Sequence, residues 1–235
     1  MKIACVAICL VSLLGCSEEE KKQKAASPRM QMERELDEVR LRLQTSSEVP
    51  MLHFNLGQIH RKYGLVDSAR NAFERSVELY EGFAEAHLQL AQIYYEDGDL
   101  EKSALAYEKT VRFDRENAVA YNNLGFVYKK LDRSEKAIQA YEQAIAADTL
   151  FAEAYNNLAQ LLRVREEDQR AIDLLQRAIV LKPDFSEAYV NLAGIYEGQQ
   201  ADEEAAVWRN FLEHSDGANQ YSVHAKERLH LLTTP

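Results

Sequence analysis

A leucine recurs every 34 residues through most of this chain, and the residue after it is always small. The leucines are Leu56, Leu90, Leu124, Leu158 and Leu192, and the small residues are Gly57, Ala91, Gly125, Ala159 and Ala193. A strict repeat of this length is typical of solenoids, in which similar units stack on one another instead of closing around one globular core. The pattern therefore favours an extended surface over a catalytic cleft.

Further columns follow the same period. Three residues before each leucine the chain carries a ring-bearing residue, namely His53, His87, Tyr121, Tyr155 or Tyr189. Four residues after the leucine stand His60, Tyr94, Tyr128 and Tyr196, and Leu162 takes this position in the fourth repeat. Spacings of three, four and seven place these side chains on one helical stripe. A second small column starts at Ala69, with a large residue four positions later in the first four repeats. Each repeat is thus predicted to be a hairpin of two antiparallel helices that buries its stripe only against its neighbours.

The series Tyr121-x2-Leu124-Gly125-x2-Tyr128, followed by Ala137-x3-Tyr141, resembles the tetratricopeptide repeat (TPR) family. The resemblance implies an all-α, right-handed superhelical solenoid with flanking helices at both ends. Five repeats are expected, at 50–83, 84–117, 118–151, 152–185 and 186–219.

Two features depart from the family pattern. Gly64 and Gly98 fit the turn glycine of the family, whereas Asp132, Glu166 and Gln200 replace it in the later repeats. The fifth repeat is degenerate, with Arg209 and Leu212 where Tyr and Ala are expected. An end repeat that faces solvent is expected to differ in this way.

Two amphipathic helices are expected to flank the repeats. Ser27 and Pro28 are typical of an N-cap and a first helical residue, and an apolar stripe continues through residues 28–45 at Met32, Leu36, Val39 and Leu43. This helix either covers the open edge of the first repeat or pairs with a second copy as a short coiled coil. Residues 220–235 carry a second stripe, which either caps the last repeat or serves as a separate partner-binding tail.

Residues 1–15 have the character of a secretory signal, with Lys2, a short apolar run and a small residue before Cys16. The ending Leu13-Leu14-Gly15-Cys16 resembles a bacterial lipobox, which implies acylation of Cys16 and a charged tether at 16–27. The resemblance places the chain in the bacterial envelope, on the periplasmic face of the outer membrane. Plain secretion and an uncleaved membrane anchor are the alternatives. All three cysteines precede residue 17, so we expect no disulfide and no metal–thiolate site.

The net charge of −10 argues against nucleic acid as a partner. No phosphate-binding glycine loop, HExxH or GxSxG motif is present. His53, His60 and His87 occupy ring columns, so we interpret them as packing residues rather than as metal ligands. We therefore expect no enzyme activity, no metal and no cofactor.

The resemblance implies that the first helix of each repeat lines a concave groove. The residue before each leucine carries a side-chain amide, which can donate to and accept from the main chain of a bound peptide; these residues are Asn55, Gln89, Asn123, Asn157 and Asn191. The alternative is that asparagine is simply common at this position. Other positions of the same face carry basic or aromatic side chains, namely Arg61, Lys62, Tyr95, Phe126, Lys129, Lys130 and Arg163. They favour a peptide with acidic side chains or a terminal carboxylate, unless they are only solvated surface.

These expectations lead to a functional hypothesis. The chain is interpreted as a membrane-tethered adaptor that binds a segment of a partner protein in its groove and assists assembly of an envelope complex, in the manner of pilotins or of adaptors for cell-wall enzymes. The alternative is a structural spacer that self-associates, as a homodimer for example, without a ligand in the groove.

Overall fold

The computed structural model describes residues 27–215 and 220–234, and every regular element within these ranges is an α-helix. The predicted signal, Cys16 and nearly all of the predicted tether lie outside these residues. None of the helices described here combines the length and the apolar character that a bilayer crossing requires. The chain forms two compact units, residues 1–81 and 82–235.

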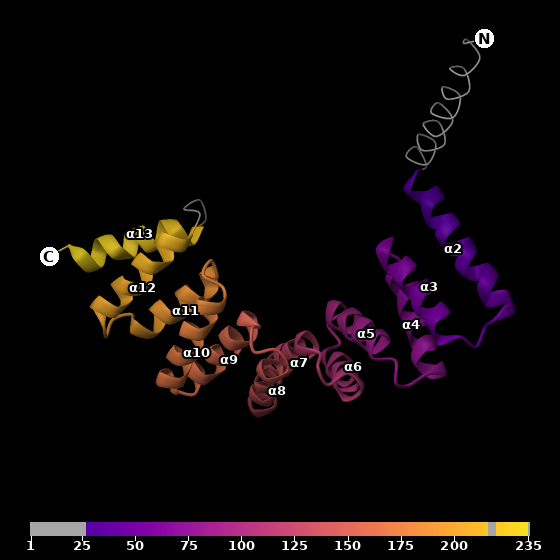
Figure 1. The fold of residues 1–235 in the computed structure, drawn as a ribbon, viewed down its shortest axis with the longest axis horizontal. Coiled ribbons are helices and arrows are strands. Elements are labelled where there is room, and N and C mark those ends of the chain that lie inside the picture. Colours follow the sequence, from indigo (N-terminus) through magenta and orange to yellow (C-terminus); the bar gives the residue numbers. More distant parts are fainter. Residues whose placement is uncertain (1–26, 216–219, 235) are drawn as a thin grey trace, which may run out of the picture. The chain divides into compact units, whose positions relative to one another are not determined.

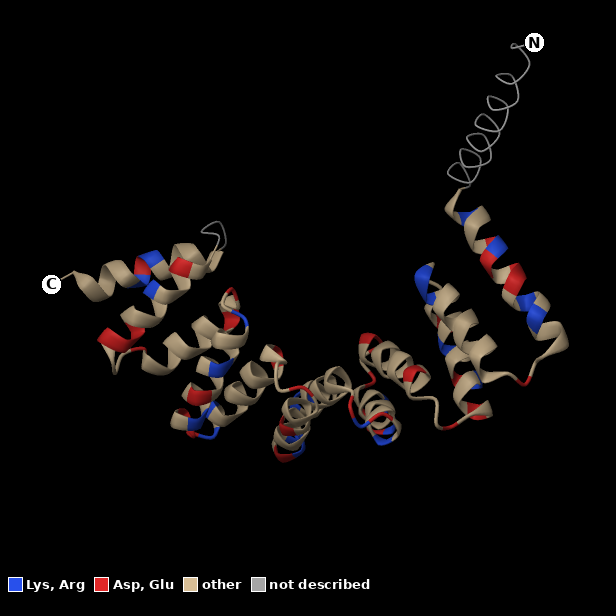
Figure 2. Ribbon diagram, viewed as in Figure 1, with Lys and Arg blue, Asp and Glu red and all other residues tan. Residues whose placement is uncertain are grey.

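The first unit contains α2 (Pro28–Thr45), α3 (Pro50–Lys62) and α4 (Val66–Leu79). The predicted N-cap is confirmed, because Ser27 Oγ accepts a hydrogen bond from the Met30 amide at 3.4 Å. Helix α2 packs on α3 within the chain, and Leu36 is buried; pairing of α2 with a second copy stays a prediction. Along α2, arginines are interspersed with Asp and Glu residues (Figure 2).

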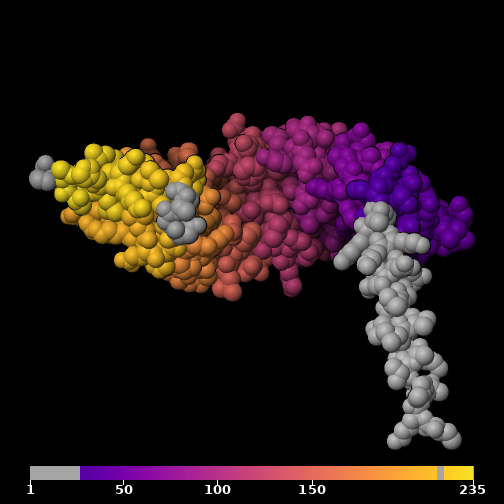
Figure 3. Space-filling model, turned by 90° about the horizontal axis from the view of Figure 1, so that it is seen from above, coloured from indigo at the N-terminus to yellow at the C-terminus, as the bar shows by residue number. Residues whose placement is uncertain are grey.

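The second unit contains four hairpins and a closing helix (Figure 1). The first helices of the hairpins are α5 (Ala84–Glu96), α7 (Ala118–Lys130), α9 (Ala152–Val164) and α11 (Ser186–Tyr196). The second helices are α6 (Leu100–Phe113), α8 (Ser134–Ala147), α10 (Asp168–Leu181) and α12 (Ala201–His214). Helix α13 (Gln220–Thr233) packs on α12. Each hairpin contacts the next in sequence order, as the colours of the space-filling view show for this unit (Figure 3).

The small columns explain why the two helices of a hairpin approach closely. A Cβ atom added to Gly125 would lie 2.7 Å from a ring carbon of Tyr141, whose side chain is fully buried. At Ala159 the column carries alanine, and the large position of that repeat holds the smaller Leu175, whereas Ala91 is matched by Tyr107. Four of the five repeat leucines, all those of the second unit, are buried. The prediction of an all-α stack of TPR hairpins is therefore confirmed.

The turn inside each hairpin contains one residue in the left-handed backbone conformation, whether that residue is a glycine or not. Gly64 and Gly98 have φ of 74° and 80°, and Asp132 and Glu166, at the same place in the third and fourth repeats, have φ of 56° and 61°. The hairpin geometry therefore imposes the conformation, and the two acidic residues bear its steric cost. In the fifth repeat the turn moves to Gly198, because α11 ends two residues earlier relative to its leucine than the other first helices do.

We expect Asp132→Gly and Glu166→Gly each to stabilise the protein by about 0.5–1 kcal/mol. Relief of the left-handed strain, roughly 1–2 kcal/mol, exceeds the extra backbone entropy that glycine gives to the unfolded chain. Urea denaturation followed by circular dichroism measures the change. The neighbouring substitution Glu167→Gly, at the N-cap of α10, lacks this relief and is the control. A loss of stability in both turn variants would contradict the strain argument.

In the fifth repeat Arg209 stands where the other repeats bury a large residue, and different residues of α12 form the buried face. Trp208 and Phe211 are buried instead, next to Tyr189, Ala193 and Ala225. Their rings contact one another at a centroid distance of 6.2 Å in an edge-on arrangement. The shift arises because the partner of α12 is α13 rather than the first helix of a sixth hairpin.

A buried ion pair joins α13 to α12. Glu204 is 1% exposed, and its carboxylate accepts hydrogen bonds from Arg228 Nε at 2.8 Å and Arg228 Nη2 at 2.9 Å. Trp208 Nε1 donates to the same carboxylate at 3.2 Å. Arg228 also lies 3.3 Å from the Glu197 carboxylate. Arg228 therefore links α13 to α12 through Glu204 and to the C-cap of α11 through Glu197, which the apolar stripe of α13 alone does not predict.

Candidate functional site

The first helices of the second unit form a row in which a residue of each helix contacts the next helix of the row. In each case, the residue five positions after one repeat leucine contacts the residue two positions after the next repeat leucine. Tyr95 and Phe126 meet edge-on, with ring centroids 5.8 Å apart and planes at 64°. Lys129 Nζ donates a hydrogen bond to Gln160 Oε1 at 2.9 Å. We call the face that these contacts define, on α5, α7, α9 and α11, the groove face.

The third contact of this kind involves a glycine. The Arg163 guanidinium covers Gly194, such that a Cβ atom on Gly194 would lie 3.2 Å from Arg163 Nη1. The corresponding position carries Gln92, Phe126 or Gln160 in the preceding repeats. The absence of a side chain at Gly194 thus leaves room for the guanidinium, and the chemistry of the groove face changes from aromatic to cationic along the row.

Burial affects the cations of the groove face unequally. Lys129 is half-buried, and this burial, together with the positive charge of Lys130, lowers the pKa of its ammonium group. Lys130 is exposed and lies over the Phe126 ring, 5.5 Å from its centroid. A carboxylate placed near Lys129 would replace part of the lost hydration and stabilise its charged form.

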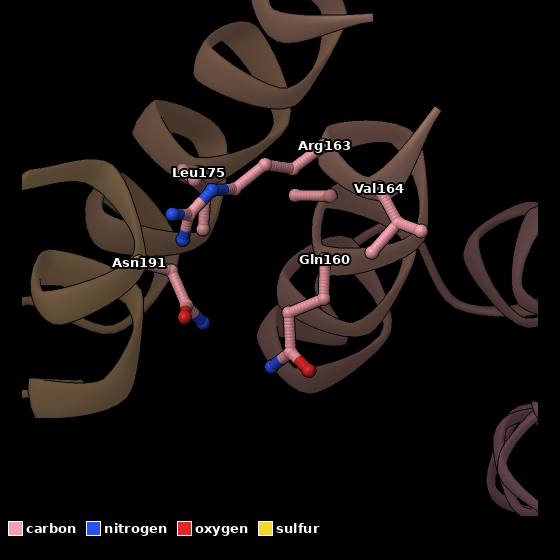
Figure 4. Close-up of a pocket in the computed structure, with 6 residues that line it drawn as sticks. Gln160, Arg163, Val164, Leu175 and Asn191 are labelled. Carbon is pink, nitrogen blue, oxygen red and sulfur yellow. The ribbon is translucent and has the colours of Figure 1, made fainter. Parts of the chain in front are cut away.

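Arg163 also borders a pocket of about 420 Å³ between α9 and α11. The lining residues are Ala159, Gln160, Arg163, Val164, Leu175 and Asn191. In Figure 4 the Arg163 side chain extends across this pocket toward Leu175 and Asn191. Within the described part of the chain its guanidinium has no hydrogen-bonding or ionic partner, whereas nearby Arg165 is paired with Glu135 and Glu167. The pocket therefore combines an unpaired guanidinium, two amides and an apolar floor.

The predicted amide column is partly used to join successive helices. Asn157 Nδ2 donates to Asn122 Oδ1 at 2.8 Å, and Asn191 Nδ2 donates to Asn156 Oδ1 at 2.8 Å. Each donor keeps a second N–H and its carbonyl oxygen for other partners. Asn123 has no hydrogen-bond partner among the described residues, because the position that would accept from it is occupied by Leu88.

The remaining predicted residues are placed differently. Lys62 in the first unit forms an ion pair with Glu35 of α2 at 2.6 Å, and this hydrogen bond lowers the pKa of the Glu35 carboxyl group. Its charge thus serves the packing of α2 on α3. Asn55 is exposed on α3, and Arg61 is half-buried on the same helix. In the second unit Gln89 is half-buried on α5.

Two of the three histidines of the ring columns have local structural contacts, and the third, His60, is half-buried on α3. His53 Nε2 lies 2.8 Å from the Ser47 carbonyl oxygen, and His87 is buried and stacked on Phe113 with ring centroids 6.0 Å apart. Burial, and secondarily the charge of Arg40, lower the pKa of His60. Among the described residues, no three or more His, Cys, Asp or Glu side chains come together in a way that could hold a metal ion.

The sequence patterns did not single out Asn122, Asn156 or Gly194. One signal for the paired asparagines was present, since Asn-Asn precedes the leucine in two consecutive repeats. The signal for Gly194 was the loss of a side chain in a column that is otherwise large.

Stacked helical hairpins with an inner row of polar and aromatic side chains define a helical-repeat scaffold for binding other proteins. The chain belongs to the tetratricopeptide repeat family: models described as "Tetratricopeptide repeat" match residues 52–83, 118–148 and 151–182, and one described as "TPR repeat" matches residues 91–132. Together these matches span more than half of the chain. TPR domains bind protein or peptide partners, and no catalytic family matches.

Several solved structures share this fold. One of them is a crystal structure of MamA, whose sequence is 26% identical to this chain. The match covers 75% of this chain and 97% of the MamA chain, with a TM-score of 0.61. YrrB, described as a TPR protein with an unusual peptide-binding site, is 17% identical over 80% of this chain and 97% of its own, with a TM-score of 0.67. PilF of Pseudomonas aeruginosa is 18% identical over 79% of this chain and 89% of its own, with a TM-score of 0.61. No curated protein matches in a sequence comparison.

Proposed function

We propose that the chain is a membrane-tethered adaptor that binds an extended, acidic segment of a partner protein on its groove face. The observation that carries the proposal is the unpaired Arg163 guanidinium in a pocket shared with Gln160 and Asn191. A guanidinium binds carboxylates in a bidentate manner, and the amides can bind main chain. The peptide-binding site named for YrrB gives a precedent on the same fold.

The envelope part of the proposal rests on residues 1–16, whose pattern resembles a lipoprotein signal with Cys16 as the acylated residue. An adaptor held at the membrane by acyl chains would present its groove face to periplasmic partners. The fold is shared with PilF, and assistance with the assembly of an envelope complex is the role we propose for the tethered chain. Adaptors for cell-wall enzymes are the other class of partner that this arrangement suits.

A photo-crosslinking amino acid at Val164 tests the proposal in intact cells. Val164 borders the pocket and is 81% exposed, so a captured segment should yield a discrete adduct that mass spectrometry identifies. Leu105, on the second helix α6 and 58% exposed, is the control position. Adducts from Leu105 but none from Val164 would contradict capture on the groove face. Adducts only with a second copy would favour the self-associating spacer.

A further inference from the structure

If the groove face captures a peptide as proposed above, the order of its contacts also fixes what that peptide must contain. The row begins with an aromatic pair between α5 and α7, continues with a lysine–glutamine contact between α7 and α9, and ends with the guanidinium pocket between α9 and α11. The two ends therefore differ in chemistry. A bound segment has to match both ends at a fixed separation.

The pocket end is built to hold an anion. Gln160 Oε1 already accepts a hydrogen bond from Lys129, and the two donors on the amide nitrogen remain available to an anion. Arg163 adds a planar set of donors, and no carboxylate lines the pocket. Ala159 and Leu175 supply an apolar floor for the carbon atoms next to the charged group. These features select a carboxylate over an amine or a neutral side chain.

The opposite end is built to hold a ring. Tyr95 is exposed and presents its ring edge-on to Phe126, and Lys130 lies over the Phe126 ring. A further aromatic side chain can add to such a pair in an offset or edge-on arrangement, which contributes about 0.5–1.5 kcal/mol beyond the area it buries. The aromatic end is thus a second point of selection.

The two ends are separated by two steps along the row of first helices. Packed helices lie about 8–10 Å apart, so the separation is roughly 20 Å. An extended chain advances about 3.3 Å per residue, and six residues therefore span this distance. We propose that the groove face selects an extended segment in which an aromatic side chain and a carboxylate lie about six residues apart.

A spacing series of labelled peptides tests this proposal with the whole chain. Each peptide has one Trp and one carboxylate in a Gly/Ser background, and their separation varies from about two to about ten residues. The carboxylate is an internal Glu in amidated peptides or the free C-terminus in a second set, so the two arms distinguish a side-chain from a terminal source. Fluorescence anisotropy should show a maximum affinity near six residues in at least one arm, about tenfold above the extremes.

Arg163→Gln should abolish this maximum, whereas Arg177→Gln, an exposed change of equal charge on α10, should leave it in place. Binding that does not depend on spacing would overturn the six-residue rule and leave the proposed capture intact. Binding in neither arm would also overturn the rule, and the crosslinking at Val164 then decides the proposed function separately.

Discussion

Replacing Glu204 by alanine is expected to lower the free energy of unfolding of the last hairpin by about 3 kcal/mol. The substitution leaves the Arg228 guanidinium without its closest counter-ion and the Trp208 indole N–H without an acceptor. Breaking one partner of a buried ion pair costs about 3–5 kcal/mol, and the remaining contact of Arg228 with Glu197 favours the lower value. Because a repeat protein couples mainly through nearest neighbours, the loss should concentrate at α12 and α13.

The chain offers a direct probe of this effect, since Trp208 is its single tryptophan. In the Glu204→Ala variant, tryptophan emission should shift to the red at a lower urea concentration than the loss of total helicity. Hydrogen exchange should accelerate in α13 and remain unchanged in α7 and α8. Glu203→Ala, an exposed change one residue away, should alter stability by less than about 0.5 kcal/mol.

A double substitution separates the ion pair from its burial cost. Glu204→Met combined with Arg228→Met replaces both charged groups with apolar ones of similar length, and such replacements are often neutral or stabilising. We expect the double variant to recover most of the stability that Glu204→Ala loses. Equal instability of both variants would show that packing, rather than an uncompensated charge, causes the loss.

Reversing the charges of Lys129 and Arg163 together is expected to weaken partner binding by about a hundredfold. Each cation is expected to contribute a charge-assisted hydrogen bond of about 1.5 kcal/mol or more, and about 1.4 kcal/mol corresponds to a factor of ten in affinity. Folding should be unaffected, because Arg163 is exposed and a glutamate at 129 can accept a hydrogen bond from the Gln160 amide. The affinity of the unmodified chain should also fall with increasing salt.

Arg115→Glu with Arg177→Glu provides the matched control, with the same change in net charge at exposed positions outside the groove face. Affinity of the two double variants for the crosslinked partner can be compared by biolayer interferometry, with circular dichroism confirming equal helicity. If both double variants bind as well as the unmodified chain, the cations of the groove face do not recognise the partner.

The sequence predicted the hairpins because the 34-residue period reports directly on which side chains are buried. Leu124, Gly125 and Tyr141 lie where the periodic columns place them, and the small residue and the ring are in contact. The period carries no information on which side chains of one first helix contact the first helix of the next repeat. The contacts of Lys129 with Gln160 and of Arg163 with Gly194 depend on the rotation of neighbouring helices, which only the structure supplies.

The ends of the stack were harder to predict for a different reason. Arg209 interrupts the ring column, but the buried face of α12 turns to Trp208 and Phe211 because α13 rather than another hairpin covers it. Asp132 and Glu166 share the place of the turn glycine in the period, but their residue types do not favour its left-handed conformation, which is imposed by the two helices that they connect. Both features follow from the neighbours of a residue and not from its own type.

The two asparagine pairs have a consequence for how the groove face accommodates a ligand. The pairs Asn122–Asn157 and Asn156–Asn191 link successive first helices from α7 to α11, so we expect the guanidinium pocket to need little reorganisation on binding. Between α5 and α7 the position of the acceptor is occupied by Leu88, so the asparagine pair has no counterpart there. We therefore expect the carboxylate to determine where a segment docks, while the aromatic end adjusts by small rotations to rings of different size.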